Sequence, residues 1–275
     1  MTVALSLIAA LAWTTANYWL VPISRSVDPY LASLLLLLGN GACTIPIALA
    51  LDGPPGSAEL GPFGYALLAG VLEVGGFLFF FRALERGDLA VVAPIIGLEG
   101  GIAALAVFAF GERVGALVVL GLAIALLGGC LAASEGGRRT AAGAVPAAGA
   151  AVCLGAMFAV YAAAEDLGPV SVVATSHLSA LTLLGALVVW RGVRLPARDV
   201  RARLLALGAL DAAAFVAYAY AASRGPVSVA AVVAGQFSTL SAVAGIVLLR
   251  ERLRPHQYLG IGLAGAGTAW LAFAH

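Results

Sequence analysis

The chain is 275 residues long, 62% hydrophobic and only 11% charged, and its formal net charge is +1. Soluble domains carry about 25% charged residues, and a soluble fold of this length could not bury so much apolar surface, so we exclude that class. All fifteen basic residues are arginines, and they form no cluster with interleaved aromatic residues, which excludes a nucleic-acid partner.

Ten apolar runs follow one another along the chain, each long enough to cross a bilayer as a helix of about 20 residues. They cover residues 3–21, 29–51, 63–83, 89–110, 114–133, 142–164, 169–190, 204–222, 227–249 and 257–274. Glycine and proline breaks separate the runs, and only two of the connecting segments exceed ten residues, which leaves no room for a soluble domain. The sequence therefore predicts an all-α integral membrane protein with ten transmembrane helices.

The first apolar run begins almost at Met1, with no basic segment before it and no small-residue cleavage pattern after it. A secretory signal peptide would carry both features. We therefore expect this run to be retained as the first transmembrane helix.

Arginines gather in the loops that follow odd-numbered runs. These loops hold thirteen of the fifteen, whereas the loops after even-numbered runs hold only Arg113 and Arg224. Loops that stay in the cytoplasm retain positive charge. We therefore expect the odd-numbered loops, including residues 191–203, in the cytoplasm and both termini outside the inner (plasma) membrane.

The sequence also repeats internally. Residues Glu73, Phe77, Phe80, Arg86 and Gly87 recur 138 positions later as Asp211, Phe215, Tyr218, Arg224 and Gly225. After one inserted residue, Glu112, Arg113, Gly121 and Gly128 recur 139 positions later as Glu251, Arg252, Gly260 and Gly267. Five helices in each half is an odd number, so the second half crosses the membrane in the opposite direction. The expected domains are two inverted five-helix repeats, residues 1–137 and 138–275.

With this duplication, the chain resembles the drug/metabolite transporter superfamily, and within it the ten-helix EamA-type exporters made of two five-helix domains. The resemblance covers nearly the whole chain. It rests on Ala12-Trp13, Ala83-Leu84, Pro94, Gly111-Glu112-Arg113, Arg224-Gly225 and the segment from Leu249 to Leu253. One departure is Val232, which stands where the repeat would place a partner for Pro94, so a symmetric pair of kinked helices is not expected.

The resemblance implies that the first helix lies beside a central cavity, which favours Trp13 and Asn17 as substrate contacts. It also implies that the fifth and tenth helices, which are rich in small residues, form a scaffold. Glu112 and Glu251 come just before these two helices, where a carboxylate favours the positive end of the helix dipole. We interpret both as structural.

Two acidic residues that correspond in the repeat, Glu73 and Asp211, fall near the middle of the third and eighth runs. An unpaired ionised carboxylate inside the bilayer costs several kcal/mol, so such residues are functional candidates. Each is followed at i+4 and i+7 by aromatic residues on the same helix face, Phe77 and Phe80 in one case and Phe215 and Tyr218 in the other. A carboxylate beside aromatic rings suits an ammonium group. The alternative is a protonated carboxyl that is bonded to a neighbouring helix.

Glu99 lies midway along the fourth run, five residues after Pro94, which should free a backbone carbonyl and kink the helix. It is a candidate to bind a proton or a cation, with a packing hydrogen bond as the alternative. Its approximate partners in the repeat, Gln236 and Ser238, are polar but uncharged, so a coupling role would be asymmetric.

His177 in the seventh run lies near Ser176 and Ser179, and an imidazole in this position is either a proton relay or an ordinary hydrogen-bonded side chain. Asn40 in the second run is a further polar candidate. An intramembrane enzyme would need such a serine and histidine pair together with an oxyanion site, and nothing in the sequence supplies the latter.

Ten helices, an inverted repeat and a few polar residues near the middle of the membrane favour a secondary transporter that works by alternating access. A channel-like or uncoupled facilitator is the main alternative, although no ring of like charges or carbonyl-filter motif is present. No cofactor and no metal are predicted, since Cys43, Cys130 and Cys153 each stand alone inside an apolar run. The expected partners are a small-molecule substrate and the lipid bilayer, with the chain acting as a monomer or a homodimer.

We expect Glu73, Asp211 and Glu99 to line or border a central cavity, where at least one changes protonation during transport. A buried carboxyl gives up its proton less readily than one in water, so one site can serve both a proton and a cationic substrate. Glu73 is the first candidate, because its side chain is longer than that of Asp211 and because both aromatic residues that follow it on the same helix face, Phe77 and Phe80, are phenylalanines. The predicted substrate is an amino acid or another amine-bearing or cationic solute.

Overall fold

The computed structural model describes residues 1–53, 60–103, 115–133, 138–224, 230 and 233–273. Within these residues the chain forms helices and no strands, as the sequence predicts. The helices are α1 (Thr2–Ser24), α2 (Pro29–Leu51), α3 (Leu60–Arg86), α4 (Leu89–Ile96), α6 (Ala116–Ala133), α7 (Arg138–Ala162), the 3₁₀ helix η2 (Glu165–Leu167), α8 (Pro169–Arg191), α9 (Arg198–Ser223), α11 (Phe237–Val247) and α12 (Pro255–Phe273).

Among the described residues, six helices are long and apolar enough to cross a membrane, namely α1, α2, α3, α7, α8 and α9. Two shorter apolar helical segments cover Leu89–Ala103 and Val233–Val247. Large hydrophobic side chains point outward, and Val189 and Trp190 are 82% and 80% exposed. Such a surface is stable in contact with lipid rather than water. The protein is therefore a multi-pass membrane protein.

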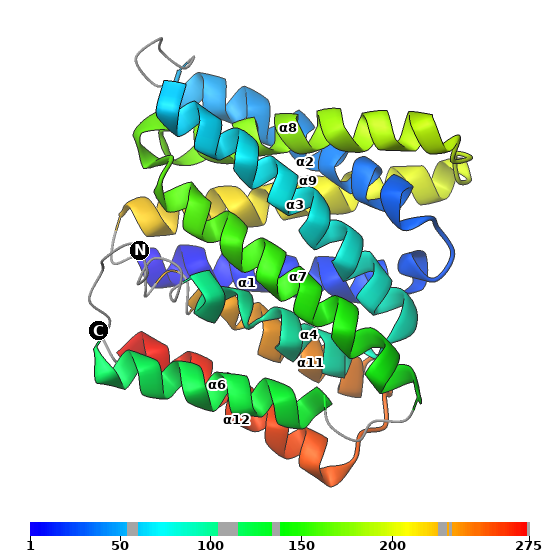
Figure 1. Cartoon of the computed structure of the whole chain (residues 1–275), viewed down its shortest axis with the longest axis vertical. Helices are drawn as coiled ribbons and strands as arrows, with labels where there is room; N and C mark the ends of the chain where they lie inside the picture. The colour runs from blue at the N-terminus through cyan, green and yellow to red at the C-terminus, as the bar shows by residue number, and fades with distance from the viewer. Residues whose placement is uncertain (54–59, 104–114, 134–137, 225–229, 231–232, 274–275) are drawn as a thin grey trace.

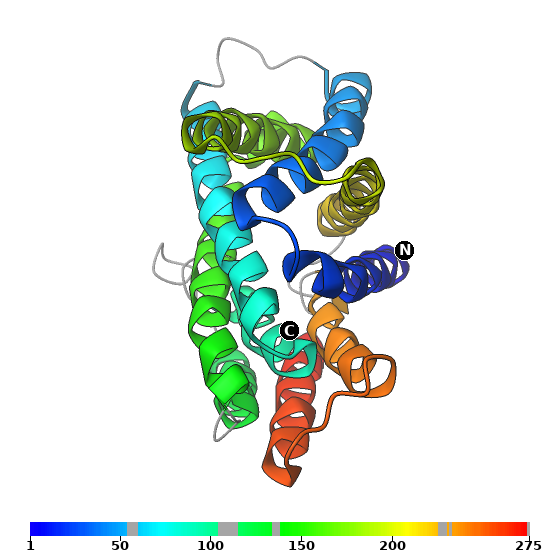
Figure 2. The ribbon, with the colours of Figure 1, turned by 90° about the vertical axis from the view of Figure 1, so that its right-hand side faces the viewer.

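The helices lie side by side and run from one face of the molecule to the opposite one (Figure 1). The N-terminus and the end of α12 lie on the same side, at the left of Figure 1, and we call this side the termini face. The connections 25–28, 192–197 and 248–254 lie on the opposite side, which is turned toward the viewer in Figure 2. We call it the arginine face, because these connections and their flanks carry most of the arginines.

Among the residues that the structure describes, two helices are interrupted part-way along their length. α4 ends at Ile96, residues 97–98 form a turn, and the helix resumes at Glu99. The helical segment that leads into α11 is likewise interrupted at Gln236, which lies 138 residues after Leu98. The two breaks thus correspond in position, whereas Val232, the counterpart of Pro94 at which no second kink was expected, lies outside the described residues.

The second interruption forms without proline because local hydrogen bonds replace those of the regular helix. The Ser238 hydroxyl donates to the Gly235 carbonyl oxygen at 2.9 Å, and the Gln236 N–H donates to the carbonyl of Val233, only three residues back. The two interruptions also touch, because a Cβ atom added to Gly97 would strike the side chain of Ser238. The broken helices therefore cross each other at their breaks.

Glycines allow two further close crossings that position the polar residues. A Cβ atom on Gly208 of α9 would strike the carbonyl oxygen of Leu36 in α2. A Cβ atom on Gly70 of α3, 138 residues earlier, would strike the carbonyl oxygen of Ser176 in α8. These contacts bring α2 next to α9 and α8 next to α3, so that each pair of helices shares buried polar groups.

Glu251 stabilises a helix other than the one that follows it. Its Oε1 and Oε2 atoms accept hydrogen bonds from the N–H groups of Leu89 and Ala90, the first residues of α4, at 2.9 and 2.8 Å. Burial raises the pKa of Glu251, while these two N–H groups favour its ionised form. The expectation that Glu251 stabilises the N-terminus of a helix is therefore correct, but the helix is α4 and not α12, which follows Glu251 in the chain. The chain turns back before α12 at Arg250, whose φ is 56°. Glu112 lies outside the described residues.

Candidate functional site

Asp211 on α9 is held by two helices of the first half of the chain. Its Oδ1 atom accepts a hydrogen bond from Trp13 Nε1 on α1 at 2.9 Å, and its Oδ2 atom accepts one from Asn40 Nδ2 on α2 at 2.8 Å. Both donors are neutral, so they fix the direction of the carboxylate without cancelling its negative charge. Asp211 is 5% exposed, and that small exposed part faces a cavity.

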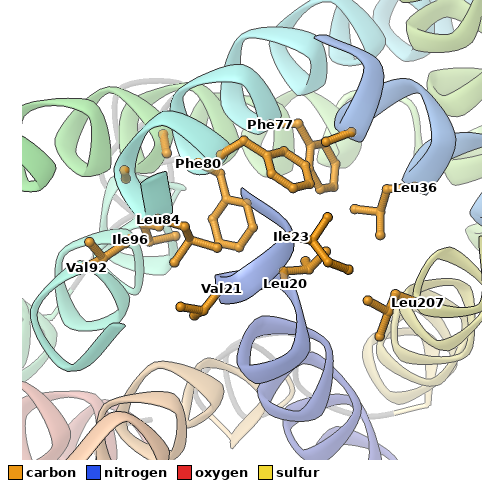
Figure 3. Packing of buried hydrophobic residues seen from close by; sticks show 14 of the residues in the cluster. Leu20, Val21, Ile23, Leu36, Phe77, Phe80, Leu84, Val92, Ile96 and Leu207 are labelled. Carbon is orange, nitrogen blue, oxygen red and sulfur yellow. The ribbon is translucent and has the colours of Figure 1, made fainter. Parts of the chain in front are cut away.

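The cavity encloses ≈ 580 Å³ of empty space, counting the part that opens outward. Its wall is rich in aromatic rings that come from five helices, namely Trp13, Phe77, Phe80, Phe158, Phe215 and Phe237. The Trp13 ring packs edge-on against Phe215 at 5.3 Å between centroids and against Phe237 at 5.6 Å, so these contacts fix the orientation of the rings. Figure 3 shows Phe77 and Phe80 of α3 close to Leu20 of α1 and to Leu36 of α2, which also line the cavity.

Glu99 is the second acidic residue on the cavity wall, and it stands where the broken helix of residues 89–103 resumes. It is 8% exposed, and its side chain makes no hydrogen bond or ion pair to any other residue that the structure describes. An ionised carboxylate buried without a partner costs several kcal/mol. This position therefore suits a proton or a cationic ligand.

Glu73 lies behind the cavity rather than on its wall. It is fully buried, its Oε1 atom lies 2.8 Å from His177 Nε2, and its Oε2 atom accepts a hydrogen bond from the Ser176 hydroxyl at 2.9 Å. Both partners are on α8, which crosses α3 at Gly70, just before Glu73 along the chain. This geometry corrects the expectation that Glu73 lines the cavity. Phe77 and Phe80, which follow Glu73 on the same face of α3, reach the cavity, whereas the Glu73 carboxylate turns toward α8.

Polar contacts continue from the buried pair toward Asp211. His177 Nδ1 lies 3.5 Å from the Thr44 hydroxyl, which donates to the Asn40 carbonyl oxygen at 3.1 Å, and the Asn40 side chain binds Asp211. The His177 ring also meets the Phe215 ring edge-on at 5.5 Å. The two acids are thus the ends of one buried polar chain that involves α3, α8, α2 and α9.

The remaining predicted residues are placed differently from one another. Asn17 lines the cavity and donates to the Ser241 hydroxyl of α11 at 3.2 Å. Tyr218 is not part of the cavity wall but packs against the rings of Trp13 and Phe158. Gln236 occupies the second helix break, where its amide nitrogen is buried without a hydrogen-bond partner among the described residues.

Reasoning from the sequence did not single out Thr44, Phe158, Phe237 or Ser241. Thr44 follows Asn40 by one helical turn and thus shares its face, which is a signal that was available. The other three lie in apolar stretches where a phenylalanine or a serine is common, and nothing in the local sequence marks them. Within the described part of the chain, no three His, Cys, Asp or Glu side chains come close enough to hold a metal ion.

Comparison with known proteins gives a family match for most of the chain. Two segments, residues 1–134 and 141–273, match the model of the EamA-like transporter family. No curated protein matches the sequence. A protein of known crystal structure is similar over 99% of this chain and 96% of its own, with a TM-score of 0.68 and 22% sequence identity, which shows a shared fold.

Proposed function

Because the chain belongs to the EamA-like transporter family, we propose that it is a secondary transporter of ten transmembrane helices that moves a small amine-bearing solute across the inner membrane. It works by alternating access between two inverted five-helix repeats, residues 1–137 and 138–275. The observation that carries the proposed substrate class is the Asp211 carboxylate, held by neutral donors at the edge of an aromatic cavity.

The packing of helices supports the repeat. If α1, α2, α3, α4 and α6 correspond to α7, α8, α9, α11 and α12, the contacts between the halves occur in matched pairs. α1 packs on α9 as α7 packs on α3, and α2 packs on α9 as α8 packs on α3. α6 and α12, the last helices of the two halves, pack on each other. Such exchange symmetry is expected of inverted repeats.

The cavity chemistry supports an ammonium group as the part of the solute that is recognised. A fixed carboxylate attracts a cation, and aromatic faces add cation–π attraction. Trp13 and Phe215 meet directly beside Asp211, so the attraction of the carboxylate and the cation–π attraction act on the ammonium group at one place. The apolar remainder of the wall, including Leu20 and Met157, suits the hydrocarbon part of the solute.

Proton coupling follows from the two acids that share the cavity. A proton and an ammonium group compete for the Asp211 carboxylate, and Glu99, which has no side-chain partner among the described residues, offers a second position for a proton. Glu73 is no longer the first candidate, because its oxygen atoms contact His177 and Ser176 of α8 and it is not among the residues that line the cavity.

The distribution of arginines supports the orientation. The arginine face, with connections 25–28, 192–197 and 248–254, lies in the cytoplasm, and the termini face lies outside. Cysteine labelling at position 197 tests this orientation, since reagent added outside intact cells should not reach it.

The proposed function is tested with purified protein in proteoliposomes. Labelled amino acids and organic cations are offered with and without a proton gradient, and counterflow is measured with unlabelled solute inside. We expect counterflow above that of empty vesicles for at least one amine-bearing solute. A flux that does not respond to solute on the opposite side would favour the alternative, a channel-like facilitator.

A further inference from the structure

Two carboxylates near the ends of helices, outside the cavity, each join one half of the chain to the other. Asp52 follows the last residue of α2, and its Oδ2 atom accepts hydrogen bonds from the N–H groups of Val170 and Ser171 at 2.9 and 2.7 Å. Glu251 accepts hydrogen bonds from the N–H groups of Leu89 and Ala90 in the same way. In both cases a carboxylate of one half caps the first turn of a helix of the other half.

At both contacts a glycine in the neighbouring backbone leaves space for the carboxylate. Gly168 has a φ of 93°, and a Cβ atom there would strike the carboxylate of Asp52. A Cβ atom on Gly245 would strike the Glu251 carboxylate, and it would also lie 2.8 Å from the Ala90 nitrogen. Each carboxylate is therefore seated between the helix that it caps and a glycine that leaves room for it.

The two contacts lie on opposite faces of the molecule. α3 begins at Leu60, shortly after Asp52, and ends at Arg86, three residues before the Leu89 that Glu251 binds. A helix of 27 residues is about 40 Å long, enough to cross a bilayer. Asp52 thus lies on the termini face, where α2 ends and α8 begins, and Glu251 lies on the arginine face.

We propose that Asp52 and Glu251 are the two gate latches of the transport cycle, Asp52 holding the halves together on the termini face and Glu251 on the arginine face. The inference rests on the alternating access of the proposed function. A cavity between two halves opens to one side when the halves separate there, so the hydrogen bonds on that side must break while those on the other side hold. In this structure both latches are closed.

The test measures access to the cavity and requires no knowledge of the solute. Cys43, Cys130 and Cys153 are first replaced by alanine, and Ala16→Cys then places one thiol on the cavity wall. A charged, membrane-impermeant thiol reagent is applied to sealed vesicles of known orientation, and the labelling rate is measured from each side. A tag on the N-terminus identifies the termini face.

We expect Asp52→Ala to raise labelling from the termini face by about tenfold and to leave labelling from the arginine face unchanged or lower, because a lost cap shifts a two-state equilibrium by about this factor. Glu251→Ala should do the reverse. Asp52→Asn should change the rate less, since its amide oxygen still accepts the N–H bonds. Leu89→Pro removes one donor at a helix position that favours proline, so it tests the second latch even where Glu251→Ala fails to fold.

The matched control is Asp28→Ala. Asp28 also caps a helix, accepting from the Tyr30 N–H at 2.9 Å, but that helix is its own α2 and no bond between the halves is lost. The latch proposal is overturned if Asp52→Ala and Glu251→Ala open the same face, if neither changes the labelling, or if Asp28→Ala has an equal effect. Failure to find a transported solute would count against the proposed function and leave this labelling result standing.

Discussion

Asp211 and Glu73 occupy corresponding positions 138 residues apart, yet their surroundings differ in kind. Asp211 receives hydrogen bonds from an indole and an amide and faces an aromatic cavity. Glu73 accepts a hydrogen bond from the Ser176 hydroxyl, its Oε1 atom lies 2.8 Å from His177 Nε2, and it is sealed inside the helix bundle. Each acid is bonded by the second helix of the opposite half, α2 for Asp211 and α8 for Glu73.

The difference shows that the partner decides what a buried carboxylate can do. Neutral donors such as Trp13 and Asn40 leave the charge of Asp211 available to a ligand. An imidazole such as His177 compensates the charge of Glu73 when it is protonated, so that no ligand is required. We therefore propose that one half of the chain presents an acid for binding, whereas the other half uses an acid to hold two helices together.

The largest expected effect is that of Asp211→Asn on transport. The amide keeps the size of the side chain but removes the charge that attracts the solute, and the loss of one partner of a buried charge pair costs about 2–5 kcal/mol. We expect transport in proteoliposomes to fall by at least about thirtyfold. Asp199→Asn, an exposed substitution in the first turn of the same helix, is the matched control and should transport normally.

Glu73→Gln should act mainly on stability. It removes the carboxylate oxygen that lies 2.8 Å from His177 Nε2 in a fully buried contact, and the loss of one partner of such a contact costs about 3–5 kcal/mol when the histidine is protonated and about 1–3 kcal/mol when it is neutral. We expect a clear fall in the thermal midpoint in detergent, with transport of the folded fraction within about threefold of wild type. A double-mutant cycle with His177→Ala should recover part of the loss. Additive effects of the two changes would show that the residues do not interact.

Gly208→Ala should destabilise the crossing of α9 and α2. The added methyl group meets the Leu36 carbonyl oxygen and the Gly39 backbone, and such overpacking costs about 1–3 kcal/mol. Gly185→Ala in α8 is the control, because no atom lies within 4 Å of its added Cβ, and it should be neutral or stabilising. Thermal unfolding of the two variants side by side measures the difference.

Trp13→Phe should have the smallest effect of the series. It keeps an aromatic ring on the cavity wall but removes the N–H group that binds Asp211 Oδ1, a neutral hydrogen bond worth about 1 kcal/mol. We expect solute affinity to fall by about fivefold. An unchanged affinity would mean that Asn40 alone is enough to orient the carboxylate.

The sequence predicted the helical membrane class, and its apolar runs correspond closely to α1, α2, α3, α8 and α9. It also drew attention to Asp211, Glu99, Trp13 and Asn17, because polar or aromatic residues stand out inside apolar runs. It did not reveal which helices face each other, so the pairing of Glu73 with His177 and of Asp211 with Asn40 could not be read from it. The break at Gln236 escaped prediction for a similar reason, since local side-chain hydrogen bonds, not proline, produce it.

We propose that Asp211, and not Glu73, binds the cationic group of the solute. The most direct measurement is the affinity of an amine-bearing solute and of its neutral analogue without the amine, each titrated by calorimetry into wild type, Asp211→Asn and Glu73→Gln. We predict that wild type and Glu73→Gln prefer the amine by at least about thirtyfold, and that Asp211→Asn binds the two compounds equally. A preference that persists in Asp211→Asn and is lost in Glu73→Gln would contradict the account.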